Sequence, residues 1–113
     1  METVIKPWGS YTNLIDDEHT KVKKIVIKPG ESPSYQYHHQ RREVWIITQG
    51  TLKVRLNDVY KMYGAGDTVQ IPRLSKHQPI NVGEDDVEFI EVQLGTYFGE
   101  DDIVRLEDKY GRV

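Results

Sequence analysis

The chain has 113 residues, a length that fits one domain spanning residues 1–113. It contains no cysteine, which excludes disulfides, cysteine-ligated zinc and thiol nucleophiles. The formal net charge is −3 and the charges are interspersed, so no nucleic-acid partner is expected. The apolar runs are far too short to cross a bilayer, and the N-terminus lacks the pattern of a signal peptide. The sequence therefore predicts a cytoplasmic protein with no membrane partner.

Short β-prone runs that end at turn residues dominate the chain. In chain order they cover residues 22–28, 43–48, 51–56, 59–63, 68–71 and 87–94. Turn signals recur about every 8–12 residues, which is typical of an antiparallel sandwich or barrel and not of alternating strands and helices. The runs 51–56 and 59–63 predict a hairpin around Asn57-Asp58. Because Asn-Asp is a weaker hairpin signal than Asn-Gly, the register of this pair is left open.

The C-terminal tail is the one segment with a helical signal. Asp101 and Asp102 can cap a short helical turn, with Ile103, Val104 and Leu106 packing inward. A short strand fits the same residues equally well. In either form we expect the tail to act as a flap over the barrel.

Metal-ligating side chains gather in one part of the chain. Without cysteine, ligands must come from histidine, carboxylate and amide groups. Gln36 and His38 are two residues apart, so on a strand they share a face, whereas His39 points to the other. Glu43 follows across an expected bend, and His77 comes from a distant run. A barrel interior can bring these four groups together.

Each of these residues also has an ordinary structural explanation. A lone histidine near a strand end is often a surface or hydrogen-bonded residue. Trp8 and Trp45 are most simply core residues, and an arginine such as Arg41 can be a surface residue paired with an acidic neighbour. The spacing of glycine and proline around the candidate ligands is what favours a site.

That spacing resembles the two sequence motifs of the cupin family. The residues at the positions of the first motif are Gly30, Gln36, His38, Glu43 and Gly50, and those of the second are Gly66, Pro72, His77 and Asn81. The resemblance implies an all-β cupin fold, the double-stranded β-helix or jelly-roll barrel. It also implies one divalent metal ion held by Gln36, His38, Glu43 and His77. Two positions depart from the common pattern, since most cupins have His at Gln36 and Gly at Leu74.

Longer segments resemble the bacterial type II mannose-6-phosphate isomerases, including the C-terminal domain of enzymes that also carry mannose-1-phosphate guanylyltransferase. The matching segments are PWGSY from Pro7, KKIVIKPG from Lys23, the ligand region from Ser34 to Trp45, and EVQLGTYFGEDDIVRLEDKYGR from Glu91 to Arg112. The resemblance covers nearly the whole chain. The chain matches the isomerase portion alone, so no nucleotidyl transfer is expected.

This resemblance implies a metal-dependent interconversion of mannose 6-phosphate and fructose 6-phosphate. Zn²⁺ is the expected metal, with Mn²⁺, Co²⁺, Fe²⁺ and Ni²⁺ as alternatives. Arg41 is the expected catalytic residue, holding the substrate or stabilising an enediolate. Phosphate favours Lys and Arg partners, and the residues assigned to it are Lys23, Lys24 and Arg105. The proton-transfer base stays open among His39, Glu91 and Lys23. A homodimer is the expected assembly.

Two competing hypotheses remain beside the isomerase. The family usually has His at the positions of Gln40 and Val44, and this chain lacks both. The first competing hypothesis is therefore a non-catalytic cupin that binds a sugar phosphate or a nucleotide sugar. A metal-dependent oxygenase on the same barrel is the other hypothesis. Because such oxygenases mostly use three or four His ligands, Gln36 makes this option less favoured.

Overall fold

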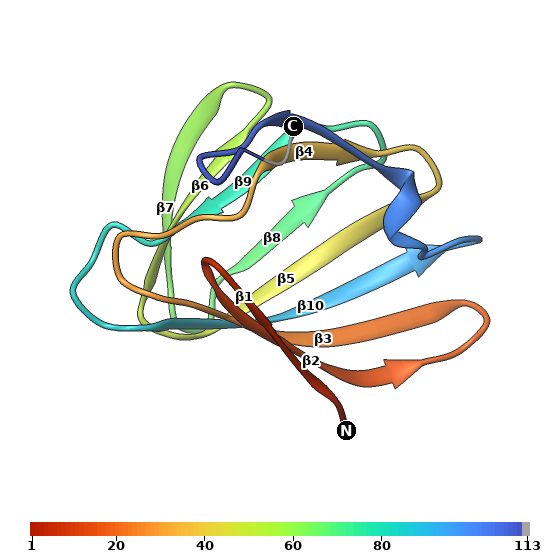
Figure 1. Ribbon diagram of the computed structural model, residues 1–113, viewed down its shortest axis with the longest axis horizontal. Helices are drawn as coiled ribbons and strands as arrows, with labels where there is room; N and C mark the ends of the chain where they lie inside the picture. Colours follow the sequence, from red (N-terminus) through yellow and green to blue (C-terminus); the bar gives the residue numbers. More distant parts are fainter. Residues whose placement is uncertain (112–113) are drawn as a thin grey trace.

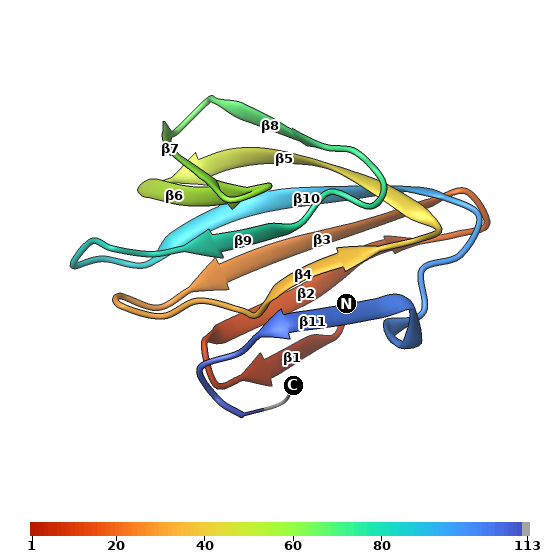
Figure 2. The same ribbon diagram turned by 90° about the horizontal axis from the view of Figure 1, so that it is seen from above.

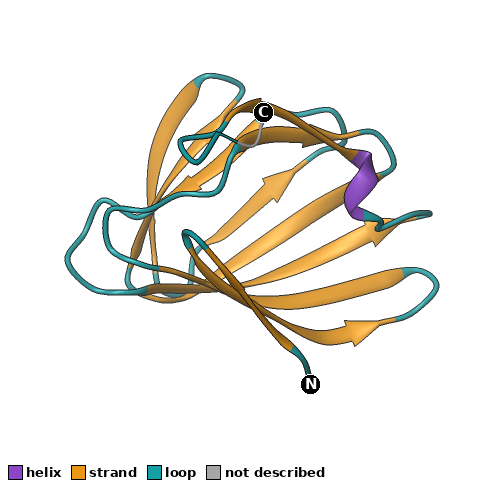
Figure 3. Ribbon diagram, viewed as in Figure 1, coloured by secondary structure: helices purple, strands orange, loops and turns teal. Residues whose placement is uncertain are grey.

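Strands make up almost all of the regular structure of the chain, as the computed structural model shows (Figure 3). It describes residues 1–111, so Arg112 at the end of the closing stretch lies outside the described residues. The strands are β1 (Thr3–Lys6), β2 (Gly9–Asp16), β3 (Thr20–Ile27), β4 (Tyr35–His38), β5 (Arg41–Gln49), β6 (Thr51–Leu56), β7 (Val59–Gly64), β8 (Thr68–Ile71), β9 (His77–Ile80), β10 (Val87–Gly95) and β11 (Ile103–Glu107). A short 3₁₀ turn, η1 (Glu100–Asp102), precedes β11. No helix within the described range has the length and apolarity needed to span a bilayer.

The strands form two antiparallel sheets that face each other (Figure 1). The first sheet has the order β1-β2-β3-β10-β5-β8, and the second has the order β11-β4-β9-β6-β7. Neighbours such as β3 and β10 are far apart in sequence, and β11 pairs with β4 at the edge of the second sheet (Figure 2). The all-β jelly-roll prediction is therefore confirmed.

The hairpin around Asn57 and Asp58 has a definite register. Leu56 pairs with Val59, which leaves a two-residue turn between β6 and β7. Asn57 has φ of 46° and Asp58 has φ of 69°, so both lie in the left-handed region. Two successive positive φ values are the mark of a type I′ turn, which Asn and Asp tolerate better than most residues.

The N-terminal hairpin β1–β2 was not among the predicted strands, because its residues show no clean apolar alternation. Its position depends on a close backbone approach at Gly9. A Cβ atom at this position would lie 2.0 Å from the carbonyl oxygen of Val26, so only glycine fits there. The Lys28 N–H then donates to the Trp8 carbonyl at 3.0 Å, which ties the hairpin to the end of β3.

Inward-facing residues change from polar to apolar along the central strands of the first sheet. On β5 the buried positions are Arg41 and Glu43, followed by Trp45 and Ile47. On β10 the apolar pair comes first, with Val87 and Phe89 before Glu91 and Gln93, because this strand runs antiparallel to β5. The hydrophobic core therefore fills one end of the space between the sheets, and polar groups gather at the other. Both tryptophans are buried, as predicted.

The tail combines the two predicted alternatives, since η1 is followed by the edge strand β11. The predicted capping role is wrong, because Gly99 is the N-cap residue and no side chain caps the turn. Asp102 is buried instead and accepts the backbone N–H groups of His39 and Gln40 at 3.3 and 3.0 Å. Leu106 does not pack inward, since it is 38% exposed.

Candidate metal centre and its cavity

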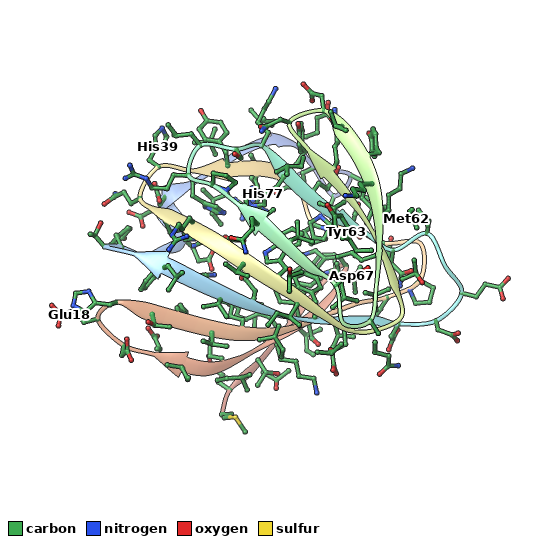
Figure 4. The ribbon with its side chains drawn as sticks, turned by 180° about the vertical axis from the view of Figure 1, so that it is seen from behind. Glu18, His39, Met62, Tyr63, Asp67 and His77 are labelled. Atoms are coloured by element: carbon green, nitrogen blue, oxygen red, sulfur yellow. The ribbon has the colours of Figure 1, made fainter. Side chains whose placement is uncertain are left out.

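The four predicted ligands come from both sheets and meet at the polar end of the interior. Gln36 and His38 lie on β4, His77 lies opposite Gln36 on β9, and Glu43 lies on β5 of the facing sheet. Ligand atoms of His38, Glu43 and His77 all lie within 4.8 Å of one another. Figure 4 shows His77 among the side chains between the sheets, whereas His39 lies at the outer edge.

The distances between these groups suit a single ion. The His38 Nε2 atom lies 3.3 Å from Glu43 Oε2, and the His77 Nε2 atom lies 3.9 Å from Glu43 Oε1. Two ligands bound about 2.0–2.2 Å from one ion are separated by roughly 3–4 Å, so only small adjustments are needed. The histidines supply neutral nitrogen and Glu43 supplies one negative charge, a donor set that suits a first-row divalent ion.

The ring of His77 is held in the form that a metal ligand needs. Its Nδ1 atom lies 2.9 Å from the carbonyl oxygen of Ser75, so Nδ1–H donates and the Nε2 lone pair faces Glu43. Burial lowers the pKa of His77 despite the opposing effect of Glu43, which favours the neutral ring. Gln36 is fixed in a similar way, because its amide nitrogen donates to Ser34 Oγ at 3.1 Å and leaves the amide oxygen as the ligand atom.

Glu43 is anchored through both of its oxygens. Trp45 Nε1 donates to Oε1 at 2.9 Å, and Arg41 Nε donates to Oε2 at 2.9 Å. Burial alone would raise the pKa of this carboxyl. The contacts with His38, His77 and Arg41 outweigh it and hold the pKa well below the usual range. The site therefore contains a carboxylate whose orientation is fixed before any ion binds.

Arg41 lies directly beside the ligands, as predicted. It is 5% exposed, and its Nη2 atom lies 3.1 Å from His38 Nε2. Within residues 1–111 its Nη1 atom is buried and has no hydrogen-bond partner, as is also true of His38 Nδ1. A buried guanidinium N–H without a partner is costly. Because Arg41 lines the cavity, this donor is suited to an oxygen atom of a bound substrate.

A second buried carboxyl, Glu91, lies next to Glu43. It is 6% exposed and accepts a hydrogen bond from Gln93 Nε2 at 2.9 Å. Burial and the neighbouring Glu43 raise the pKa of Glu91 to about 8. The site thus pairs one carboxylate that stays ionised with one carboxyl whose pKa lies near neutral pH. Sequence reasoning did not single out Gln93, although its position two residues after Glu91 places it on the same face.

A cavity of about 800 Å³, counted with its open mouth, contains the four ligands, Arg41 and Glu91. Lys23 and Arg105, two of the three residues that the sequence assigned to a substrate phosphate, also line it. Lys24, the third residue assigned to the phosphate, is not among the described residues that line the cavity. It is the next residue along β3, so its side chain points to the other face of the sheet and pairs with Glu88 at 3.0 Å. Tyr11 and Glu100 line the cavity as well, and sequence reasoning had given them no role.

The three residues considered for proton transfer are placed differently. The side chain of His39 is 55% exposed and lies 3.6 Å from Asp102 on the outside. Lys23 lines the cavity but is paired with Glu100. Glu91 faces the cavity beside Glu43. Of the three, Lys23 and Glu91 therefore face the cavity and His39 does not.

Comparison with known proteins assigns the chain to a family. The family described as mannose-6-phosphate isomerase C-terminal matches residues 1–108. The chain belongs to this family. The mannose-1-phosphate guanylyltransferase ManC of Salmonella typhimurium is 43% identical over 110 residues, which is 97% of this chain and 23% of that protein. The alginate biosynthesis protein AlgA of Pseudomonas aeruginosa is 45% identical over the same share of each chain.

The chain spans about a quarter of the length of these curated relatives of the mannose-6-phosphate isomerase C-terminal family. A solved structure of a conserved Klebsiella pneumoniae protein with a double-stranded β-helix domain has a TM-score of 0.77 at 17% identity. The match covers 95% of this chain and 86% of that one. This likeness shows the cupin fold. The motif resemblance seen in the sequence is therefore confirmed at the level of both family and fold.

Proposed function

We propose that the chain is a metal-dependent sugar-phosphate isomerase that interconverts mannose 6-phosphate and fructose 6-phosphate. The observation that carries the proposal is the arrangement of one cavity. It holds three convergent ligand groups with Gln36 in the same lining, a buried arginine with a free N–H, a second carboxyl, and three further cationic side chains. Membership of the mannose-6-phosphate isomerase C-terminal family supports the same reaction.

The two family histidines that this chain lacks do not weaken the proposal. Val44 lies between buried Glu43 and buried Trp45 on β5, so its side chain is on the outer face of the first sheet. Gln40 is exposed in the turn between β4 and β5, where its N–H donates to Asp102. Among the residues that the structure describes, neither lines the cavity. A histidine at either position would therefore be outside the proposed reaction site.

The reaction moves one proton between C2 and C1 of the sugar phosphate and another between O2 and O1, through a cis-enediol. A divalent ion held by the four ligands supplies Lewis acidity toward the sugar oxygens when it is bound. Glu91 is placed to remove the proton from one carbon and return it to the other. Arg41 offers its free N–H to the oxygen on which negative charge develops. Lys23 and Arg105 hold the phosphate.

The test is a coupled assay that follows fructose 6-phosphate formation from mannose 6-phosphate, with Zn²⁺, Mn²⁺ or Co²⁺ added to the purified protein. We expect turnover that needs the metal and that falls by at least about 100-fold in Arg41→Met, because a donor aimed at the developing oxyanion is lost. Lys24→Met is the matched control, since this residue is outside the cavity.

Absence of turnover in folded, fully metal-loaded protein would overturn the isomerase proposal. Binding of mannose 6-phosphate or a nucleotide sugar without turnover would then support the non-catalytic cupin. Oxygen uptake would instead support the oxygenase.

A further inference from the structure

Lys23 is a buried cation whose ionic partner comes from a different element. The residue is 5% exposed on the inner face of β3. Its Nζ atom lies 4.2 Å from the centre of the Tyr11 ring and 3.1 Å from Glu100 Oε1. An ammonium group held this far from water needs an anion nearby. In this structure Glu100 supplies that anion.

Glu100 is much less constrained than the lysine it contacts. It is the first residue of η1, the three-residue turn that links β10 of the first sheet to β11 of the second (Figure 1). Its side chain is 54% exposed, against 6% for the side chain of Lys23. Once another anion takes its place on Lys23, this half-exposed carboxylate can return to water, because it is already partly solvated.

The position on Lys23 that Glu100 takes is suited to a phosphate oxygen. A phosphate monoester carries more negative charge than a carboxylate and has three acceptor oxygens. Arg105 lines the same cavity from β11, and within residues 1–111 its Nε atom is buried and has no hydrogen-bond partner. A phosphate group bound here would therefore satisfy Lys23 and also give Arg105 an acceptor.

We infer that Glu100 is a displaceable carboxylate that competes with the substrate phosphate for Lys23. When a sugar phosphate enters the cavity, its phosphate replaces Glu100 on the ammonium group and the carboxylate moves out to water. Glu100 thereby sets the affinity of the phosphate subsite. The inference rests on the proposed function for the sugar part of the ligand, but phosphate binding is measured without any turnover.

The test is calorimetric titration of the metal-loaded protein with inorganic phosphate, mannose 6-phosphate and mannose. Glu100→Gln removes the competing charge, so we expect both phosphate ligands to bind about 3- to 10-fold more tightly than to the unchanged protein. The affinity for mannose, which has no phosphate, should stay the same. Asp101→Asn is the matched control, because it removes one charge from the same turn at a residue that accepts a hydrogen bond from Tyr97.

A double-mutant cycle separates the specific exchange from a general effect of charge. In the background of Lys23→Met, the Glu100→Gln change should no longer affect phosphate affinity. The reason is that the ammonium group for which Glu100 and the phosphate compete is then absent. The inference is overturned if Glu100→Gln and Asp101→Asn tighten phosphate binding equally, or if the gain persists without Lys23. A protein that shows the expected pattern but no isomerase activity would keep this inference and lose the proposed reaction. Isomerase activity without the expected changes in phosphate affinity would keep the proposed reaction and overturn this inference.

Discussion

Leu74 has a backbone conformation that its side chain disfavours. Its φ is 67°, in the left-handed region, and its N–H donates to the His38 carbonyl at 2.9 Å. The loop between β8 and β9 is thereby tied to the strand that carries two ligands. The side chain is 59% exposed, so packing offsets little of the strain. This is the position at which most cupins have glycine, which explains the usual residue in physical terms.

We therefore expect Leu74→Gly to stabilise the protein. A left-handed conformation costs an L-residue about 1–2 kcal/mol, and the extra unfolded-state entropy of glycine offsets about half of that. The free energy of unfolding, measured by urea titration, should rise by about 0.5–1 kcal/mol. Val82→Gly is the matched control, because Val82 is 57% exposed but is not among the residues with positive φ. The explanation fails if both changes lower stability to the same extent.

Among the elements, η1 is anchored mainly through Asp102. The Asp102 side chain is 5% exposed, and its oxygens accept the backbone N–H groups of the turn between β4 and β5. Burial raises the pKa of Asp102, but these N–H groups, together with His38 and His39, lower it by more. The ionised carboxylate is thus the form that the fold prefers. It holds the turn that carries Glu100, a residue that lines the cavity.

Asp102→Asn should destabilise the protein in a pH-dependent way. A group with a depressed folded pKa contributes its stability above the unfolded pKa and loses it as the pH falls through the folded value. We expect a loss of about 1–3 kcal/mol at pH 7, because a charged acceptor of two backbone N–H groups is replaced. The difference should shrink toward zero below the ordinary Asp pKa of 3.8.

Urea unfolding from pH 7 down to pH 3 measures that difference. Asp16→Asn, at the exposed end of β2, is the control and should change stability by less than about 0.5 kcal/mol throughout. A constant difference between Asp102→Asn and the unchanged protein at every pH would show that charge plays no part in anchoring η1.

The elements also show which features the sequence could predict. Alternation and turn residues located β3, β5, β6, β8 and β10, which bury alternate positions, and also β7, which has no buried position. The N-terminal hairpin had no such pattern, since its position depends on the contact of Gly9 with β3. Lys23 and Lys24 were indistinguishable by charge, and only the register of β3 separates them. Glu100 gave no signal because its contact with Lys23 joins residues 77 positions apart.

The resemblance of the motif spacing to the cupin pattern, by contrast, predicted which ligand groups meet. Ligand atoms of His38, Glu43 and His77 come together in the structure, and Gln36 lines the same cavity. Arg41 was identified by the same segment. Its contact with Glu43 follows from their spacing of two residues on β5, whereas its contact with His38 on β4 depends on the two sheets coming together.

At the scale of the whole molecule, the candidate metal centre joins the two sheets. Three of the four ligands lie on β4 and β9 of the second sheet, and Glu43 lies on β5 of the first. The core adjoins the cavity, and Trp45 and Phe89 belong to both. A bound ion would add a further link between the two sheets at this point. The homodimer implied by the resemblance stays a prediction, since only one chain is described.

Metal removal should therefore lower the stability of the whole fold. An ion that binds only the folded state stabilises it by about 2.7 kcal/mol when its free concentration is 100 times its Kd. We expect the unfolding free energy in excess Zn²⁺ to fall by about 2–3 kcal/mol when a chelator is added. His77→Ala should abolish this response, whatever its own effect on stability. His39→Ala should keep it, because that ring is at the outer edge. An equal response in all three proteins would mean that zinc acts elsewhere than on the four ligands.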